Sequence, residues 1–376
     1  MHTRHLIEDV WRRQHFWQQV GWFALAPLSL GFSAVVRGRN LLYNHGLFSA
    51  ARPPLNVVSV GNLTVGGTGK TPLVLWLAQA LRERGYRVGI LTRGYRGTNT
   101  GLTVVGTEGT PLAAPDEVGD EAVMLARRFS GVVIAGQDRV AAATRAHLDF
   151  GLDVVLLDDG FQYRRLQRDV DVLLMSGQSN NNHWNNHWLL PAGPFREPLT
   201  AVKRANVVLF TKSASVEGHR QPHVSKEKTP APIFFGELMP TALVSLVHGH
   251  WQEQPLTLVA GKRVLAITGI AAPAPFYRTL RERDAEIGEI LEFPDHHSYT
   301  NTDWQMITQL GQKYDLIVTT EKDLVKLERF PFAAGRLVAL RVQMQISPAT
   351  LFLAAIEQRF RYQKMDMTHY GCSLSH

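Results

Sequence analysis

Residues 57–72 have the sequence VVSVGNLTVGGTGKTP, and this stretch indicates the fold most clearly. A short run rich in β-branched residues leads into a glycine-rich loop, and the loop ends in Gly-Lys-Thr at positions 69–71. Residues 73–84 then have the composition of a helix, which a glycine ends. A strand, a glycine-rich loop and a helix in this order are the context in which phosphate-binding loops occur. The stretch therefore predicts an α/β sheet that binds phosphate at the carboxyl end of one strand.

The residue types in this loop suit a nucleotide. Glycines let backbone N–H groups turn toward an anion without Cβ clashes, and the N-terminus of the helix adds its positive dipole end. Lys70 can reach the β- and γ-phosphates, and the hydroxyl of Thr71 can bind Mg²⁺. The strict pattern has glycine six residues before this lysine, where the chain has Thr64. An ordinary glycine-rich turn is the simpler alternative. The predicted nucleotide-binding residues are Thr64, Val65, Gly66, Gly67, Thr68, Gly69, Lys70 and Thr71.

A second apolar strand ends in paired carboxylates. Residues 154–157 are all apolar, and Asp158 and Asp159 follow them directly. In nucleoside triphosphatases such a strand carries an aspartate to the Mg²⁺ beside the phosphate loop. Aspartates at a strand end also occur as turn formers. The Gly-Lys-Thr sequence upstream favours the metal interpretation.

Two further polar residues lie at candidate ligand positions. Arg93 comes just past the apolar strand 88–92, where open α/β sheets bind ligands. Asp120 opens a helix over 122–129, where a carboxylate commonly caps the N-terminus. From the residues alone, this aspartate can be either a helix cap or a catalytic group.

Strands and helices alternate through the first half of the chain, which predicts a P-loop-containing, doubly wound, mostly parallel sheet of the α/β class. Residues 217–232 are polar and contain prolines, as in a linker, and residues 233–258 alternate like a pair of antiparallel strands. A second, smaller α/β domain is predicted after this short antiparallel linker. The predicted segments are an N-terminal helical segment (1–45), a nucleotide-binding domain (46–215) and a C-terminal domain (216–376).

The composition limits the classes of protein to which the chain can belong. The 376 residues suffice for more than one domain, and an apolar fraction of 45% is normal for a packed globular protein. The single cysteine, Cys372, excludes a disulfide framework and fits a reducing compartment. The formal net charge of +7 favours an anionic partner, such as phosphates, nucleic acid or an acidic membrane face.

The N-terminal segment is aromatic and apolar. Residues 16–36 contain no charged side chain, and pairs of arginines precede and follow them. The strongly apolar part, 20–36, is shorter than the roughly 20 residues that a bilayer core requires, and a proline and two glycines interrupt it. An arginine-flanked segment of this kind suits the membrane interface. A pair of helices packed on the protein's own core is the alternative.

Six short motifs in one order extend over nearly the whole chain. They are GNLTVGGTGKTP (61–72), RGY (93–95), GDE (119–121), DDGFQ (158–162), GPFRE (193–197) and FPDHH (293–297). Each motif alone is modest, but the ordered set is specific. Through these motifs the sequence resembles the tetraacyldisaccharide 4′-kinase family, the lipid A 4′-kinases of Gram-negative bacteria.

The resemblance implies a reaction and a place in the cell. It implies Mg²⁺-dependent transfer of the γ-phosphate of ATP to the 4′-hydroxyl of a tetraacyl diglucosamine lipid that carries a 1-phosphate. It implies a peripheral or monotopic enzyme at the cytoplasmic face of the inner membrane, with a glycolipid substrate and an anionic membrane surface as partners. Neither nucleic acid nor a protein partner is expected. Two α/β/α domains joined by a two-stranded linker are the implied architecture.

The resemblance also implies roles for individual residues. Asp120 and His296 are expected to form a catalytic pair in which the aspartate accepts the proton of the sugar hydroxyl, and Lys70 is expected to act on the phosphates. The adjacent His297 leaves open which imidazole pairs with Asp120. Because the two partners are 176 positions apart (296 − 120), closure of two domains over ATP is expected to assemble the pair. The implied metal residues are Thr71, Glu121, Asp158 and Asp159, and the implied substrate or phosphate residues are Arg93, Arg196 and Glu197.

Two alternatives come from other classes of protein. A P-loop GTPase or nucleotide-dependent assembly factor would carry Asn-Lys-x-Asp at a strand end, and FTKS at 210–213 resembles that motif only distantly. A nucleic-acid-binding protein would agree with the positive charge. The basic residues are scattered, however, and no nucleic-acid-binding motif occurs.

Overall fold

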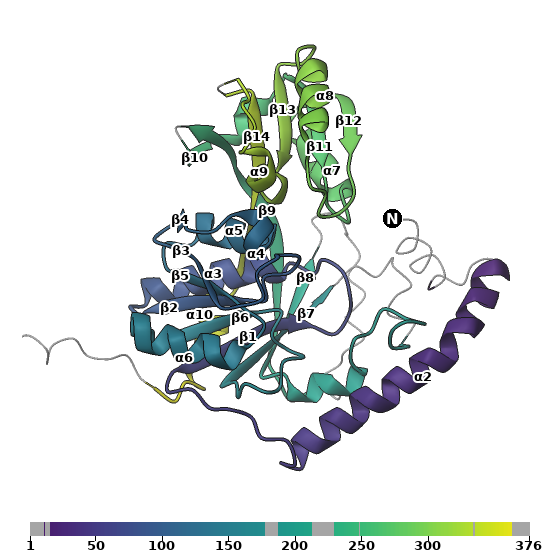
Figure 1. Cartoon of the computed structure of the whole chain (residues 1–376), viewed down its shortest axis with the longest axis vertical. Coiled ribbons are helices and arrows are strands. Elements are labelled where there is room, and N and C mark those ends of the chain that lie inside the picture. The colour runs from purple at the N-terminus through teal and green to yellow at the C-terminus, as the bar shows by residue number, and fades with distance from the viewer. Residues whose placement is uncertain are drawn as a thin grey trace, which may run out of the picture.

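The computed structural model describes residues 11, 16–176, 187–212, 229–247, 249–333 and 335–362. The asparagine- and histidine-rich stretch 177–186 and residues 217–228 of the predicted linker lie outside these ranges. The described chain has a larger lower part and a smaller upper part in the view of Figure 1.

The lower part contains the predicted phosphate-binding strand and its neighbours. Its strands are β1 (Asn56–Asn62), β2 (Val88–Thr92), β3 (Thr103–Thr107), β4 (Thr110–Pro111), β5 (Val132–Ala135), β6 (Val154–Asp158), β7 (Val170–Ser176) and β8 (Val207–Lys212). Its helices are α3 (Lys70–Glu83), α4 (Pro115–Val118), α5 (Asp120–Arg128), α6 (Arg139–Phe150) and α10 (Ala349–Glu357). The helix α10 returns to the lower part from the end of the chain (Figure 1).

The upper part has the same kind of architecture with fewer elements. Its strands are β10 (His250–Gln254), β11 (Arg263–Thr268), β12 (Glu286–Glu292) and β13 (Leu316–Thr320), and its helices are α7 (Ala274–Glu282), α8 (Asn301–Gly311) and α9 (Glu321–Leu327). Two long strands, β9 (Ile233–Val247) and β14 (Leu337–Ser347), pair antiparallel and connect the two parts (Figure 1). Together they form the two-stranded linker that the resemblance implies. The antiparallel pair predicted within residues 233–258 is instead β9 with β10, so the second linking strand lies outside that predicted stretch.

All these strands belong to one sheet. Its order is β12-β11-β13-β14-β9-β8-β7-β1-β6-β2-β5-β3-β4, and β10 pairs with β9 outside this path. The pairs are parallel except β3–β4, β3–β5, β9–β10 and β9–β14. The predicted mostly parallel α/β sheet is confirmed. The predicted domain boundaries remain a prediction, and the position of α10 shows that the last helix packs on the lower part.

Both faces of the lower sheet are covered because its central strands are apolar on both sides. In β1, Val58 packs in a cluster with Leu77 of α3, while its neighbour Val57 packs in a cluster with Ala143 of α6. Successive side chains of a strand point to opposite faces, so a fully apolar strand requires a helix layer on each face. Burial of every residue of β1 is the result.

The helix α2 (Phe16–Asn44) lies along the edge of the lower part (Figure 1). Ser29 Oγ donates a hydrogen bond of 2.6 Å to the backbone oxygen of Leu189, and Val36 is buried in a cluster with Phe161. One continuous helix containing Pro27 therefore takes the place of the pair of helices considered from the sequence. Within the described residues, Gln19–Asn44 is the one helix long and apolar enough to cross a membrane, and 11% of its most apolar window is buried.

Candidate active site

The phosphate loop has the backbone that its glycines predict. Gly66 and Gly69 adopt φ values of +107° and +86°, a region that side-chain-bearing residues rarely enter. Gly69 caps α3, so the helix begins at Lys70 with its free N–H groups directed at the loop. The segment 193–197 pairs with this loop, since Val65 N donates to the oxygen of Pro194 at 2.9 Å.

Lys70 lies in a cluster of polar side chains at the end of β1. Its Nζ is 3.2 Å from Asn62 Oδ1 and 3.5 Å from Asp159 Oδ1. Arg196 donates two hydrogen bonds of 2.8 Å to the carboxylate of Asp159 and also contacts Asn62 Oδ1. Burial raises the pKa of Asp159, but the hydrogen bond from Arg196 and the charge of Lys70 outweigh it and hold this pKa well below its usual range. The two cations therefore already face a carboxylate at the place predicted for phosphates.

Asp158 has the opposite electrostatic character. Thr71 Oγ1 donates to its Oδ2 at 3.3 Å, while its Oδ1 is buried without a hydrogen-bond partner. Burial and the negative charges of Glu121 and Asp159 raise the pKa of Asp158 from 3.8 to about 7. Burial is the main reason that this carboxyl group is hard to ionise, and the two neighbouring carboxylates outweigh the charges of Lys70 and Arg139. No group of three or more histidine, cysteine, aspartate or glutamate side chains suited to a metal occurs in the described part of the chain.

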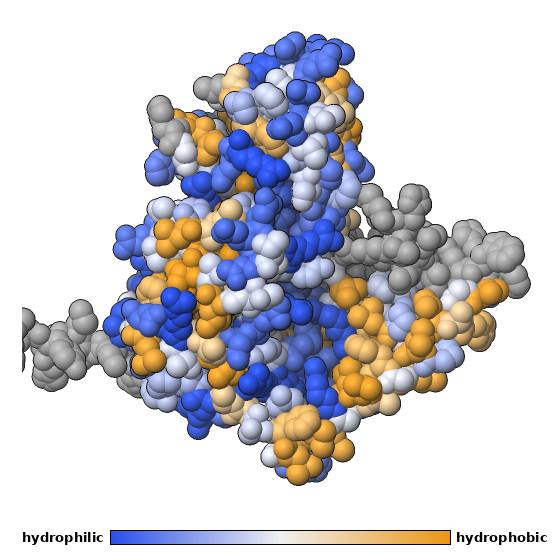
Figure 2. Space-filling model, in the orientation of Figure 1, coloured by the Kyte–Doolittle hydropathy of each residue, from blue (hydrophilic) through white to orange (hydrophobic). Residues whose placement is uncertain are grey.

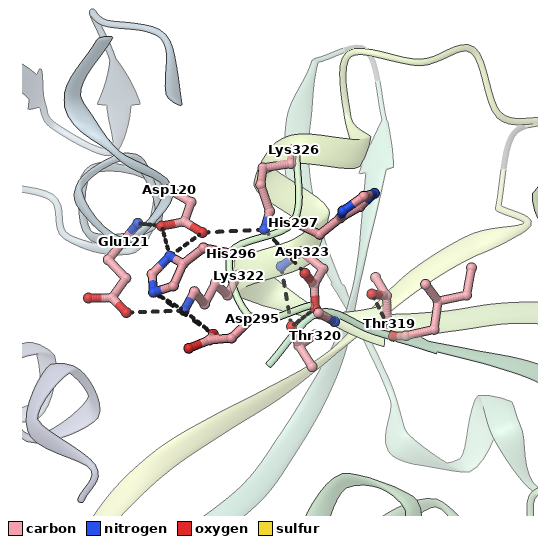
Figure 3. Close-up of polar contacts among 12 residues, drawn as sticks. Asp120, Glu121, Asp295, His296, His297, Thr319, Thr320, Lys322, Asp323 and Lys326 are labelled. Carbon is pink, nitrogen blue, oxygen red and sulfur yellow. Dashed lines mark hydrogen bonds and ion pairs between the residues drawn. The ribbon is translucent and has the colours of Figure 1, made fainter. Parts of the chain in front are cut away.

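Asp120 and His296 meet across the boundary between the two parts (Figure 3). The Nδ1 atom of the imidazole is 3.1 Å from each carboxylate oxygen of Asp120. Asp120 is the first residue of α5, and Gly119 occupies the capping position considered for the aspartate. His296 adopts a φ of +61°, an uncommon conformation for a residue other than glycine, which turns its side chain toward α5.

Two lysines of α9 complete this group of residues. Lys326 Nζ is 3.3 Å from Asp120 Oδ2, and Lys322 Nζ is 3.0 Å from His296 Nε2 and 3.3 Å from Glu121 Oε1. Burial raises the pKa of Asp120, but the hydrogen bond with His296 and the charges of both lysines outweigh it. The pKa therefore lies well below its usual range, and the carboxylate is ionised in this arrangement.

The second histidine has other partners. His297 Nε2 is 3.0 Å from Asp303 Oδ2, and its ring stacks on Phe293 with a centroid distance of 4.8 Å. Figure 3 shows its ring directed away from Asp120. The imidazole that contacts Asp120 is therefore that of His296.

The remaining predicted residues differ in their surroundings. Arg93 is exposed in the loop after β2, close enough to the buried Arg139 for their charges to interact. Glu197 is fully buried and accepts hydrogen bonds from Arg204 (2.7 Å) and Asn40 (2.8 Å). These contacts tie α2 to the lower part, and they lend no support to a phosphate-binding role for Glu197.

Four residues at this site were not predicted from the sequence: Asn62, Arg139, Lys322 and Lys326. Asn62, the last residue of β1, contacts both Lys70 and Arg196, and Arg139 donates to the backbone oxygen of Asp158 at 3.1 Å. Lys322 follows the carboxyl end of β13. A signal existed for two of them, since polar residues at the ends of buried parallel strands are candidates for ligand contacts.

A phosphate loop and a strand-end aspartate on a mostly parallel sheet define a P-loop nucleotide-binding protein. The carboxylate–imidazole pair next to it is suited to moving a proton to or from a substrate. A P-loop protein that has a carboxylate–imidazole pair beside its phosphate loop is suited to phosphoryl transfer.

Comparisons with known proteins narrow this class. The family described as Tetraacyldisaccharide-1-P 4'-kinase matches residues 21–361. Tetraacyldisaccharide 4'-kinase of Syntrophus aciditrophicus (strain SB) is 38% identical over 342 residues, which cover 87% of this chain and 90% of that protein. A crystal structure of the "apo" form of LpxK from Aquifex aeolicus in complex with ATP has a TM-score of 0.74 and 28% identity, covering 89% of this chain and 98% of that one. The chain belongs to the tetraacyldisaccharide-1-P 4′-kinase family.

Family membership confirms the resemblance stated from the six motifs. The enzyme named tetraacyldisaccharide 4'-kinase in Halothermothrix orenii is also similar, with 35% identity over 82% of this chain and 83% of that protein. These comparisons favour a kinase over the nucleotide switch and the nucleic-acid-binding protein that the sequence left open. They also confirm the predicted fold class, because the LpxK structure matches most of the chain.

Proposed function

We propose that this chain transfers the γ-phosphate of ATP to the 4′-hydroxyl of a tetraacyl disaccharide 1-phosphate in lipid A synthesis. The observation that carries the proposal is the contact of Asp120 with His296 beside the phosphate loop. Glu121, the neighbour of Asp120, is close enough to Asp158 to raise its pKa, so the pair and the loop belong to one site. The names of the relatives indicate which acceptor is phosphorylated, and the geometry of the site supports phosphoryl transfer as the reaction class.

The oxygen atoms around Thr71 fit Mg²⁺. The orphaned Oδ1 of Asp158 and the hydroxyl of Thr71 are oxygen ligands, and Glu121 and Asp159 add negative charge close by. Mg²⁺ is commonly held by one or two carboxylates together with substrate phosphates, so a cluster of three carboxylates is not required. Thr71 and Asp158 would hold the ion, with Glu121 and Asp159 near it. Bound there, the ion would neutralise charge on the transferred phosphate.

In this proposal the remaining residues position the reactants. Phosphoryl transfer depends on alignment and on charge neutralisation more than on covalent chemistry. Lys70 and the N–H groups at the start of α3 stabilise the phosphates, and Arg196 adds a second cation once it leaves Asp159. Asp120 accepts the proton of the sugar hydroxyl while His296 holds its carboxylate in place. Because the pair spans both parts, their association assembles the site and excludes water.

Incubation of the purified chain with γ-labelled ATP and the tetraacyl disaccharide 1-phosphate tests this function. The expected product is a doubly phosphorylated glycolipid that carries the label at the 4′-position. Labelled GTP and an acceptor already phosphorylated at the 4′-position are the controls. Tight GTP binding with slow hydrolysis and no labelled lipid would overturn the proposal in favour of a nucleotide switch.

We also propose that α2 holds the enzyme at an anionic membrane surface, where an acylated substrate resides. Large apolar side chains on this helix are exposed, among them Phe23 (69%), Leu28 (64%) and Val35 (70%). Figure 2 shows apolar surface along much of the visible side of the helix. An exposed apolar helix face of this length favours contact with lipid or another apolar partner. The exposed Arg37 near its C-terminal end would meet acidic headgroups, whereas Arg39 lies 3.4 Å from the buried carboxylate of Glu197.

Replacement of Phe23, Leu28 and Val35 together by serine tests this membrane contact. Flotation with liposomes that contain anionic lipid should fall several-fold, while ATP binding should stay unchanged because none of these side chains reaches the phosphate loop. A matched control replaces three equally exposed leucines elsewhere on the lower part. These are Leu112 (62%), Leu148 (74%) and Leu351 (61%). Equal flotation of both triple variants and the unaltered chain would exclude α2 as the anchor.

A further inference from the structure

We propose that Lys322 is a positioning residue that holds His296 in a single tautomer. The helix α9 begins directly after β13, and its N-cap Thr320 accepts a hydrogen bond of 3.2 Å from the backbone N–H of Asp323. Lys322 is the second residue of this helix, so the cap fixes its backbone at the carboxyl edge of the sheet. In Figure 3 its side chain extends toward α5 and ends beside the imidazole of His296.

The ammonium group of Lys322 has three partners. Its Nζ is 3.0 Å from Nε2 of His296, 3.2 Å from Oδ1 of Asp295 and 3.3 Å from Oε1 of Glu121. The side chain of Lys322 is 16% exposed. Burial lowers its pKa, but the surrounding carboxylates of Glu121, Asp120 and Asp295 outweigh this effect and raise it, so the group is a charged ammonium. Its position is thus defined by three contacts and not by one.

These contacts determine which ring nitrogen carries the proton. An ammonium group can only donate hydrogen bonds, so Nε2 of His296 accepts one through its lone pair. An ionised carboxylate can only accept, so Nδ1, which is 3.1 Å from both oxygens of Asp120, carries the hydrogen and donates it. Both neighbours of the ring therefore require the neutral imidazole with its proton on Nδ1.

Loss of Lys322 would remove one of these two constraints. Without the ammonium donor, Nε2 can take a proton, either in the neutral Nε2-protonated tautomer or in the imidazolium, in which Nδ1 still donates to Asp120. The first form loses the hydrogen bond that orients the aspartate, and the second replaces its neutral partner with a charged one. Because Lys322 acts on Asp120 through His296, its role is positioning. The catalytic significance of this role rests on the proposed kinase function, whereas the tautomer itself does not.

Lys326 provides a matched comparison on the same helix, one turn later. Its Nζ contacts Asp120 at 3.3 Å and Asp323 at 3.4 Å, and the described residues give it no contact with His296. Removal of its charge changes the environment of the aspartate but leaves the acceptor role of Nε2 intact. Comparison of variants at Lys322 and Lys326 therefore separates an effect of lost charge from an effect on the tautomer of His296.

Nitrogen chemical shifts of histidine rings test the tautomer directly. In full-length protein labelled at histidine, the signals of His296 are identified by their loss in His296→Gln. The unaltered chain should show protonated Nδ1 and unprotonated Nε2, and Lys326→Met should keep this pattern. Lys322→Met should show a proton on Nε2, with or without the one on Nδ1, and Lys322→Arg, which also offers only donors, should restore the original pattern. A proton on Nε2 in the unaltered chain, or an unchanged ring in Lys322→Met, would overturn the proposal.

Kinetics with ATP and the glycolipid acceptor give a second readout. Lys322→Met should lower kcat on the order of ten- to a hundredfold, as loss of partners that orient a functional histidine does elsewhere, with little change in KM for ATP. Lys322→Arg should recover most of the rate, and Lys313→Met, at an exposed lysine of the upper part, should match the unaltered chain. In a His296→Ala background, Lys322→Met should have no larger effect than Lys326→Met, because only the two charges then act on Asp120. A larger loss there would show that Lys322 does not act through the imidazole. An unaltered chain that shows the Nδ1 proton but no lipid phosphorylation would refute the proposed function and leave the tautomer established.

Discussion

The site combines two groups of charged side chains that are built in different ways. The phosphate-loop cluster consists of Asn62, Lys70, Asp158, Asp159 and Arg196. The inter-part cluster consists of Asp120, His296, Lys322 and Lys326. The first group comes from the ends of β1 and β6 and from two segments bonded to them, all within the lower part. The second takes its aspartate from the lower part and its imidazole and lysines from the upper part (Figure 3).

In the proposed mechanism, this difference separates nucleotide binding from proton transfer. The phosphate-loop cluster can exist whenever the lower sheet is folded, whereas the inter-part cluster requires the two parts to be in contact. A buried group of ion pairs supports that contact, since Arg128 of α5 lies 3.0 Å from Glu321 of α9, which also binds Arg341 of β14 at 2.7 Å. Nucleotide affinity should therefore depend on the first cluster, and proton transfer on the second.

Substitution of Lys70 should have the largest effect. In the proposed mechanism the ammonium group of this residue stabilises charge that develops as the γ-phosphate leaves, so Lys70→Ala should lower kcat on the order of 10²-fold or more. Turnover with saturating acceptor measures this effect. Lys203→Ala, at an exposed lysine of the same part, is the control and should retain normal turnover. Near-normal activity of Lys70→Ala would remove the phosphate loop from the mechanism.

Substitutions in the inter-part cluster should have the next largest effect, without changing ATP affinity. Asp120→Ala and His296→Ala should each lower kcat by about 10²-fold, the lower range for a general base. Because the two side chains act as one unit, the double variant should be no worse than either single variant. Rates of the three variants, with ATP binding measured on each, give the answer. Multiplicative losses would mean that the two residues act independently.

The same contrast explains how much could be predicted from the sequence. The phosphate loop and Asp158 belong to contiguous motifs with a known strand–loop–helix context, so their places were predictable. The pairing of Asp120 with His296 came from the family resemblance and not from spacing. The contacts of Lys322 and Lys326 depend on how the upper part meets α5, which no local pattern in the sequence encodes.

Adjacent residues in one motif show a second limit. Arg196 and Glu197 were grouped together because they are consecutive, yet the arginine contacts Asp159 and the glutamate contacts Asn40 of α2. The chain bends at both residues, and their side chains leave it in different directions, one toward the phosphate loop and the other toward α2. Motif membership alone could not distinguish these two directions.

A moderate effect of pH on metal binding should distinguish Asp158 from the inter-part cluster. Its pKa of about 7 in the folded chain exceeds its ordinary value of 3.8, so the metal-free folded protein binds an extra proton between these pH values. The stability that this proton confers is lost as the pH rises from about 4 to about 7. A divalent cation must displace the proton, so Mg²⁺ affinity should be about tenfold weaker at pH 6 than at pH 8.

Thermal unfolding with and without Mg²⁺ at several pH values measures this effect. The increase in Tm caused by Mg²⁺ should grow from pH 6 to pH 8. The charges that face Asp158 are those of Glu121, Asp159, Lys70 and Arg139. Asp158→Asn removes both the titrating carboxylate and a proposed metal ligand, so it should lose the Mg²⁺-dependent increase in Tm at every pH. A Tm increase independent of pH in the unaltered chain would contradict a proton shared at Asp158.

The smallest effect on kcat is expected from substitution of the neighbouring imidazole, that of His297. His297 is held by Asp303 at 3.0 Å and stacks on Phe293, so its ring serves the packing of the upper part. His297→Ala should therefore keep kcat within about twofold while lowering Tm by a few degrees through lost packing. His296→Ala should instead lower kcat by about 10²-fold. Its side chain is 11% exposed against 24% for His297, so Tm should fall in both variants and kcat should distinguish them. Parallel measurements of kcat and Tm on the two variants test this difference. A greater loss of kcat in His297→Ala than in His296→Ala would assign the catalytic imidazole to the wrong residue and with it the geometry of the inter-part cluster.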